Sequence, residues 1–193
     1  MNETRIFRRI SIVETKIIVN SINTISTELL PIFDNLKELL YTLINKITTE
    51  KDYPSIYLIT DDQQRFFDDN NIKNRIYAAG LFFGFIKKGF FYFSIEGVEY
   101  IYKNGIFTNF KQLNLNESGE KSVLYGNNIL KRMVRKSPSN LEEKDFLLLF
   151  NEFNEIIGLG ISRVNNDTIS SLKPKDVFAI NINDKGRYLR KRQ

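Results

Sequence analysis

The sequence predicts an α+β protein of two domains: an N-terminal α/β domain with an antiparallel sheet and flanking helices, and a small C-terminal β-barrel or sandwich. Apolar residues at helical spacing near the N-terminus and an aromatic hairpin pattern at 81–95 predict the first domain. Short apolar runs at 145–150, 156–161 and 177–182, separated by turn residues, predict the second. A chain of 193 residues has room for two such domains.

Two helices are expected at the start of the chain. Ser11 and Glu14 have the spacing of a capping box, so a first helix should begin there, and Pro31 should stop its apolar pattern. Asp34 should cap a second helix over residues 34–50, because leucines and isoleucines form one apolar stripe along it. We interpret this stripe as core, with partner binding as the alternative.

Two hairpins and a short helix should complete the N-terminal domain. The first hairpin is expected to turn at Asp61-Asp62 and the second at Gly89. The expected segments are strands at 55–60 and 65–67, a helix at 70–78, and strands at 81–87 and 90–95. The aromatic residues between Phe82 and Phe93 suit a base-stacking platform, but the preferred interpretation is that they fill the apolar face of the sheet.

The polar segment at residues 103–120 marks the boundary between the two domains. Its Asn-Gly and Ser-Gly pairs are typical of turns. We place the boundary near Gln112, which gives domains of residues 1–112 and 113–193. The C-terminal domain should then contain strands at 145–150, 156–161, 177–182 and 188–189.

The chain contains no histidine and no cysteine. Their absence excludes disulfides, ordinary zinc sites, cysteine nucleophiles and imidazole acid-base chemistry. A Ser-Lys pair, a carboxylate pair or a magnesium site would still be chemically feasible, but no glycine-rich phosphate loop or acidic metal motif supports one. We therefore expect a protein that is not an enzyme, with no catalytic residues, no metal site and no cofactor.

The sequence also predicts the compartment. No apolar run approaches the roughly 18 residues that a membrane span requires. The arginines at positions 5, 8 and 9 are followed by Glu14 and Lys16, which is unlike a signal peptide. A cytoplasmic protein without membrane contact is expected, or a nucleolar one in a eukaryote.

Positive charge is concentrated at the two ends of the C-terminal domain. The net charge of the whole chain is +5, and acids outnumber bases between residues 137 and 184. The basic residues are Lys131, Arg132, Arg135 and Lys136 at one end, and Lys185, Arg187, Arg190, Lys191 and Arg192 at the other. This distribution favours a polyanionic partner.

Two motifs of the C-terminal domain resemble those of a known family. They are Leu124-Tyr125-Gly126-Asn127, followed by Leu130-Lys131, and Asp184-Lys185-Gly186-Arg187-Tyr188-Leu189-Arg190. With the hairpin that ends at Ile161, they make residues 121–190 resemble a PUA domain, a small β pseudo-barrel. More narrowly, the chain is similar to the NIP-seven family of large-subunit ribosome-assembly factors. It departs from that family in the expected helix at 34–50 and in Arg132-Met133, where a glycine often stands.

The resemblance implies a non-enzymatic adaptor in large-subunit assembly and precursor rRNA processing. Its PUA domain would bind ribosomal RNA or its precursor, and its N-terminal domain would bind other ribosome-assembly proteins, exosome components among them. The protein alone would be a monomer. Two alternatives stay open: a detached specificity subunit of an RNA-modifying enzyme, which would copurify with a catalytic partner, and a pure protein-interaction module, which would lack salt-dependent RNA affinity.

The predicted RNA-binding residues are one glycine and ten bases of the C-terminal domain. Gly126 would let the chain turn and let the RNA backbone approach closely, with a plain turn glycine as the alternative. Arginine and lysine side chains would contact phosphate, with a solvated surface charge as the alternative for each. The basic residues are Lys131, Arg132, Arg163, Lys173, Lys175, Lys185, Arg187, Arg190, Lys191 and Arg192.

Overall fold

The computed structural model describes residues 5–45, 53–70 and 76–190, without the side chains of Asn70 and Leu189. The chain divides into two compact units, Met1–Phe107 and Thr108–Gln193. This division lies upstream of residue 112, because Gln112 belongs to a strand of the second unit, β6 (Lys111–Leu115). Within the polar segment 103–120, strand β6 is hard to recognise from the sequence because its polar residues are interrupted by only two buried leucines, Leu113 and Leu115.

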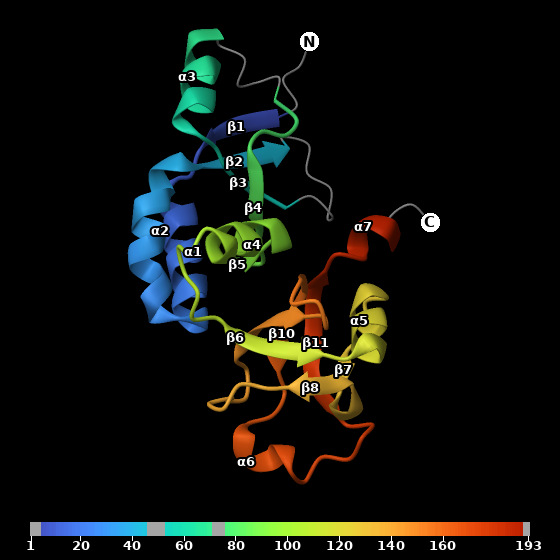
Figure 1. Ribbon diagram of the computed structural model, residues 1–193. Helices are drawn as coiled ribbons and strands as arrows, with labels where there is room; N and C mark the ends of the chain where they lie inside the picture. Colours follow the sequence, from blue (N-terminus) through green and yellow to red (C-terminus); the bar gives the residue numbers. More distant parts are fainter. Residues whose placement is uncertain (1–4, 46–52, 71–75, 191–193) are drawn as a thin grey trace. The chain divides into compact units, whose positions relative to one another are not determined.

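The N-terminal unit is built on a five-stranded antiparallel sheet with the strand order β1-β2-β3-β4-β5 (Figure 1). Its strands are β1 (Arg5–Arg9), β2 (Leu40–Asn45), β3 (Ser55–Leu58), β4 (Leu81–Lys87) and β5 (Phe90–Phe93). Two of its helices, α1 (Ile12–Ile25) and α4 (Ile95–Lys103), pack against one face. On that face the backbone N–H of Phe91 donates to the Ser21 hydroxyl at 2.8 Å. The core there includes Ile18, Ile22, Phe83, Phe93 and Ile101.

Helix α1 begins as predicted. The Ser11 hydroxyl accepts from the backbone N–H of Glu14, and the Glu14 carboxylate accepts from the backbone N–H of Ser11. The helix ends at Ile25, before Pro31. Pro31 instead lies in the first turn of a further helix, α2 (Leu30–Leu36), where its missing N–H costs no hydrogen bond.

The predicted helix at 34–50 is wrong. Asp34 lies inside α2 rather than at its start, a 3₁₀ turn (Lys37–Leu39) follows, and residues 40–45 form β2; residues 46–50 lie outside the described residues. Strand β2 pairs with both β1 and β3, and its first residues are buried. Hydrogen bonding to strands on both sides makes this segment a strand, although the spacing of its apolar residues also suits a helix.

The predicted first hairpin is half right. Its first strand exists as β3, but residues 65–67 lie in a helix, α3 (Asp61–Asn70). Thr60 and Gln63 cap this helix reciprocally, each side chain accepting from the other's backbone N–H. This capping box was the signal that the turn interpretation of Asp61-Asp62 missed. Of the helix predicted at 70–78, residues 71–75 lie outside the described residues, and residues 76–78 are not helical.

The hairpin around Gly89 is confirmed, with β4 paired to β5. The second strand ends at Phe93 because the Ser94 side chain accepts from the backbone N–H of Gly97 at 2.9 Å and so caps α4.

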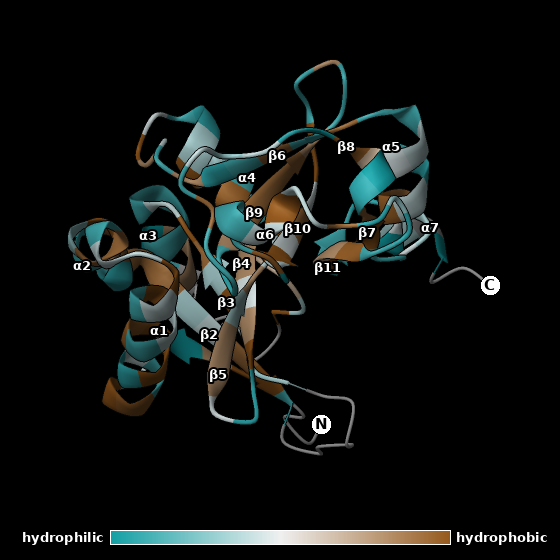
Figure 2. Cartoon of the chain, turned by 90° about the horizontal axis from the view of Figure 1, so that it is seen from below, coloured by the Kyte–Doolittle hydropathy of each residue, from teal (hydrophilic) through white to brown (hydrophobic). Residues whose placement is uncertain are grey.

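The C-terminal unit is built on a six-stranded, barrel-like sheet with the strand order β7-β11-β10-β9-β6-β8. The pairing of β6 with β9 is parallel and the others are antiparallel. The other strands are β7 (Ile129–Leu130), β8 (Val134–Lys136), β9 (Phe146–Phe150), β10 (Ile156–Ser162) and β11 (Val177–Asp184). The central strands β9 and β10 appear brown, as hydrophobic segments, in Figure 2. The predicted α+β class with a C-terminal pseudo-barrel is confirmed.

In the described part of this unit the sheet is accompanied by the α-helices α5 (Glu117–Leu124), α6 (Asn166–Ile169) and α7 (Arg187–Arg190), and by a 3₁₀ turn (Lys131–Met133). Asn116 caps α5, and Val123 carries the helix into the core. The strand predicted at 188–189 is wrong, because these residues lie in α7.

The buried carboxylate of Glu14 gives a first testable expectation. Burial alone would raise the pKa of Glu14, but the hydrogen bonds from Arg8 and Ser11 outweigh burial and lower the pKa below 4.5. A carboxyl whose pKa falls on folding stabilises the protein above its unfolded pKa and loses that contribution as the pH falls through the folded value. We expect Glu14→Gln to cost about 1 kcal/mol of unfolding free energy at pH 7, with the difference shrinking below about pH 4. Urea titrations at pH 7 and pH 3 measure it, and an equal difference at both pH values would contradict the assignment.

Candidate nucleic-acid interface

The two sequence motifs of the C-terminal unit meet around Asp184. Arg190 donates two parallel hydrogen bonds to the Asp184 carboxylate, Nη1 to Oδ1 and Nη2 to Oδ2, both 2.9 Å long. The Asn181 amide donates to the same carboxylate at 3.3 Å and to the carbonyl of Val123 at 3.0 Å. Arg190 also donates to the carbonyl of Leu124. We call Asp184, Arg190, Asn181 and these two carbonyls the motif lock, because they tie α7 and the end of β11 to the end of α5 (Figure 1).

The motif lock has a structural role: its partners satisfy the buried carboxylate of Asp184. Asp184 is only 4% exposed, and a carboxylate so buried needs charged or hydrogen-bonding partners. A bidentate pair with arginine is the strongest that side chains offer. The hydrogen bond to Asp184 raises the pKa of Arg190, in keeping with an ion pair between the two side chains. Three of the five N–H donors of Arg190 bind Asp184 and Leu124, so Arg190 belongs to the lock. Its predicted phosphate contact stays a prediction.

Two glycines fit this arrangement. A Cβ added at Gly186 would collide with the carbonyl oxygen of Leu124. Gly126 has a φ of +82°, and a Cβ there would lie 2.9 Å from Nη2 of Arg190. The positive φ at Gly126 is the conformation that a glycine turn needs. The predicted RNA contact at Gly126 stays a prediction.

The lock supports an exposed turn of four residues, 125–128. Tyr125 in this turn is 75% exposed, and Tyr188 on α7 is 55% exposed. Arg187, also on α7, is exposed. Exposed tyrosine rings on a rigid support suit base stacking, and a nearby guanidinium suits phosphate. In the sequence both tyrosines were visible only as members of the two motifs; the signal that could have singled them out is an aromatic residue within two positions of a turn glycine.

Four bases gather at the other end of β7. The backbone N–H of Lys131 donates to the carbonyl of Asp176 at 2.9 Å, and that of Arg132 donates to the carbonyl of Pro174 at 3.1 Å. These bonds hold Lys131 and Arg132 beside the loop that carries two further lysines. We call Lys131, Arg132, Lys173 and Lys175 the basic cluster.

The charge of the basic cluster is not neutralised within the described part of the chain, where none of its members forms an ion pair. The nearby carboxylate of Asp176 accepts from the backbone N–H of Lys173 at 2.7 Å. Nζ of Lys131 lies 5.6 Å from the ring centroid of Phe178, which supports its stem. The other three side chains are exposed, so the cluster can meet phosphate directly.

The exposed turn and the basic cluster lie along one edge of the sheet. Strand β7 is the edge strand and pairs with β11 through Ile129 with Ala179 and Leu130 with Val177. The turn precedes β7 and the basic cluster follows it. The Asn128 side chain accepts from the backbone N–H of Asn181, which fixes the turn against β11. One edge therefore combines two exposed rings at one end with four charges at the other.

The remaining predicted residues are placed as follows. Arg163 directly follows β10 and is exposed, and its backbone N–H donates to the carbonyl of Phe178 in β11 at 2.9 Å. Lys185 is half-buried, and its backbone N–H donates to the carbonyl of Ile157. Lys191 and Arg192 lie outside the described residues.

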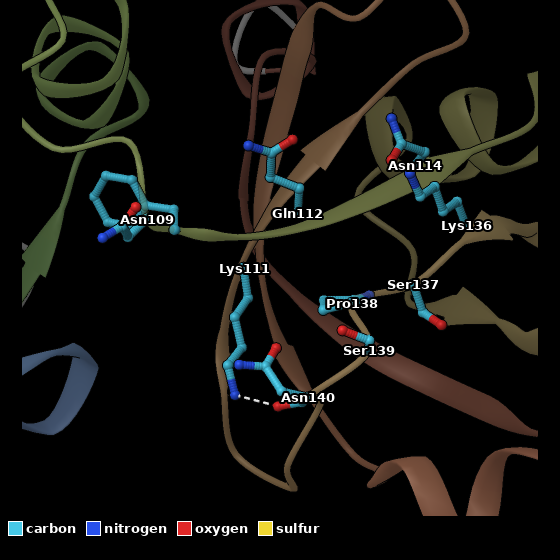
Figure 3. Close-up of a pocket in the computed structure, with 10 residues that line it drawn as sticks. Asn109, Lys111, Gln112, Asn114, Lys136, Ser137, Pro138, Ser139 and Asn140 are labelled. Carbon is cyan, nitrogen blue, oxygen red and sulfur yellow. Dashed lines mark hydrogen bonds between the residues drawn. The ribbon is translucent and has the colours of Figure 1, made fainter.

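A separate pocket of about 390 Å³ lies between β6 and residues 136–140 (Figure 3). It is lined mainly by amides and hydroxyls, and none of the predicted RNA-binding residues contributes to it. Figure 3 shows the Lys111 side chain extending to Asn140, whose carbonyl accepts from it at 2.6 Å. Nζ of Lys111 also lies 2.5 Å from the Asp145 carboxylate, so its charge is compensated. Lys136 is the other lysine of this lining, whereas the edge at β7 carries four bases. The edge at β7 is therefore the better anion site.

Among the described residues, no group of three or more acids forms a candidate metal site. No described helix is long and apolar enough to cross a bilayer.

Solved structures share this architecture. A hypothetical protein of Pyrococcus horikoshii has a TM-score of 0.60 at 11% identity, covering 93% of this chain and 94% of that one. A PUA domain structure from Aeropyrum pernix has a TM-score of 0.57 at 12% identity, covering 96% of this chain and 89% of that one. These likenesses concern the fold, and they identify the C-terminal unit as a PUA-type pseudo-barrel.

Sequence comparison finds a matching domain family and two similar proteins. The profile of the UPF0113 PUA domain matches residues 111–193. A UPF0113 protein of Archaeoglobus fulgidus is 34% identical over 100 residues, which are 52% of this chain and 55% of that protein. The 60S ribosome subunit biogenesis protein NIP7 of Saccharomyces cerevisiae is 23% identical over 167 residues, covering 82% of this chain and 90% of that protein. The C-terminal unit therefore matches the UPF0113 PUA domain, and the predicted resemblance to the NIP-seven family is confirmed.

Proposed function

We propose that this protein is a non-catalytic RNA-binding factor in the assembly of the large ribosomal subunit and the processing of precursor rRNA. The observation that carries the proposal is the edge at β7, where the basic cluster and the exposed turn are fixed on one rigid strand pair. Phosphate contacts supply most of the affinity of such a surface, and exposed rings add base stacking. The yeast relative, named for 60S subunit biogenesis, supports the assignment to ribosome assembly.

The proposed partners are ribosomal RNA or its precursor and other assembly proteins, exosome components among them. Two exposed apolar residues in the first turn of α1, Ile12 and Val13, support a protein contact on the N-terminal unit. In this proposal the protein works in the cytoplasm, or in the nucleolus of a eukaryote, and carries out no reaction itself.

Sedimentation of cell extracts tests this function. The protein should cosediment with precursors of the large subunit and be missing from mature ribosomes, and its depletion should lower the ratio of large to small subunits. Neutralising Lys131 and Arg132 by glutamine should move the protein from the precursor fractions to the top of the gradient. Copurification with one modifying enzyme in place of the precursors would instead favour the specificity-subunit alternative.

A further inference from the structure

The second face of the N-terminal sheet carries a row of aromatic rings. Side chains alternate along β5, and the register of β4 against β3 shifts at residues 82–84, so the rings of Phe83, Phe91 and Phe93 lie together on the side of α1 and α4. The intervening rings turn the other way. We call this set the aromatic face: Tyr53, Tyr57, Phe82, Phe85, Phe90 and Tyr92.

The rings of the aromatic face are ordered by pairing across the strands. Phe85 and Tyr92 stack with ring centroids 5.3 Å apart and planes 16° apart. Tyr57 and Phe82 lie 5.6 Å apart, and Tyr53 lies 6.2 Å from Phe85. Such contacts hold the rings in place before a ligand arrives, which lowers the entropy cost of binding.

Part of this sheet face is covered and part is open. At the β1 end, Phe7 and Tyr41 pack with Phe67 of α3 in a buried cluster. At the β5 end, Phe90 is 60% exposed and Tyr92 is 42% exposed. Large exposed aromatic residues side by side are unusual on a monomer and mark a binding surface.

The charge of this face favours a polyanion. None of the residues in β1 to β5 is acidic. Lys87 points to the open end, where its Nζ lies 4.9 Å from the ring centroid of Tyr53. Lys88 follows in the exposed turn. Open rings flanked by lysines, without acids on the strands, are the pattern of a surface that binds single-stranded nucleic acid.

We propose that the aromatic face is a second RNA-binding surface, on which unpaired bases stack against Tyr92 and Phe90 while Lys87 and Lys88 meet the adjacent phosphates. The inference rests on the proposed function, since the same ribosomal RNA would supply the contact, and it goes beyond that function in giving the N-terminal unit an RNA-binding role. Sequence dependence would be weak, because every base has a face that can stack.

Binding of an unstructured oligouridine to the full chain, followed by fluorescence anisotropy, tests this inference. Tyr92→Ala should lower the affinity about five- to tenfold, because one stacking ring is lost. Tyr92→Phe should keep the affinity within twofold, because the ring remains. The matched control is Tyr100→Ala: Tyr100 is 37% exposed on α4, at the opposite face of the sheet, and its loss should change nothing.

A second measurement uses the unaltered chain. Photo-crosslinking to thiouridine-containing RNA should produce adducts on the peptide that contains Phe90 and Tyr92. Wild-type affinity for Tyr92→Ala, or the absence of adducts on that peptide, would overturn the inference. If Lys131→Gln with Arg132→Gln weakens RNA binding while Tyr92→Ala does not, only this inference fails. If Tyr92→Ala instead abolishes capture of a protein and leaves RNA affinity intact, the aromatic face is a protein-docking surface.

Discussion

Replacing Asp184 by alanine should lower the free energy of unfolding of the C-terminal unit by about 2–4 kcal/mol. The substitution leaves the guanidinium of Arg190 facing the carbonyl of Leu124 without its carboxylate partner. Removing one member of a buried pair generally costs 3–5 kcal/mol, and the value is discounted here because the Arg190 side chain is 37% exposed. Urea denaturation monitored by circular dichroism gives the difference.

Two further variants make this result specific. Asp184→Asn keeps oxygen and nitrogen in place but loses the charge, so it should cost less than alanine. Glu143→Ala removes an exposed acid from the same unit and should change stability by less than about 0.5 kcal/mol. Equal stability of Asp184→Ala and Glu143→Ala would show that the lock does not hold the motifs together.

Neutralising the basic cluster should have the largest effect on RNA binding. With all four members changed to glutamine, the slope of log affinity against log salt should fall by up to about three units, at roughly 0.7 per lost phosphate contact on a single strand. Affinity at 0.1 M salt should fall at least about tenfold as a consequence. The fold should persist, because three of the four side chains are exposed and their backbone hydrogen bonds do not depend on side-chain identity.

The matched control neutralises four cations on the helical segments of the N-terminal unit, of which the first is half-buried and the others are exposed: Lys37, Lys16, Arg65 and Lys103. It changes the net charge by the same amount. Counterion release counts only charges that meet phosphate, so the slope of this control should match that of the wild type. Equal losses in both quadruple variants would mean diffuse attraction by net charge, and the basic cluster would not be a site.

Local sequence signals predicted part of the fold. The capping box at Ser11, the hairpin around Gly89 and strands β9 to β11 follow from patterns a few residues long, and all are present. The helix prediction for segment 34–50 was wrong for a physical reason. Its apolar residues can be accommodated by a helix or by a buried strand, and only the pairing of β2 with β1 and β3 decides between the two. The strand prediction for residues 188–189 was wrong because a pattern of two residues cannot distinguish a strand from one turn of helix.

The candidate site, like the fold, was only partly predictable from the sequence. The bias of charge towards the ends of the C-terminal domain was visible in the sequence, and it led to Lys131 and Arg132. Lys173 and Lys175 lie in the acid-rich segment between those ends, and folding brings their loop beside Lys131 and Arg132. What the sequence could not show is which bases are already paired. Arg190 looks like one more basic residue near the C-terminus, and only the approach of Asp184 and Leu124 in the folded chain gives it a structural task.

Binding of RNA at the edge at β7 can be measured directly by photo-crosslinking of the full chain to single-stranded RNA, followed by mass spectrometry. We expect adducts on the turn at residues 125–128, on Lys131 and Arg132, and on the loop with Lys173 and Lys175. The adducts on the turn should be centred on Tyr125. Adducts confined to the pocket beside β6, or to the N-terminal unit alone, would contradict RNA binding at this edge.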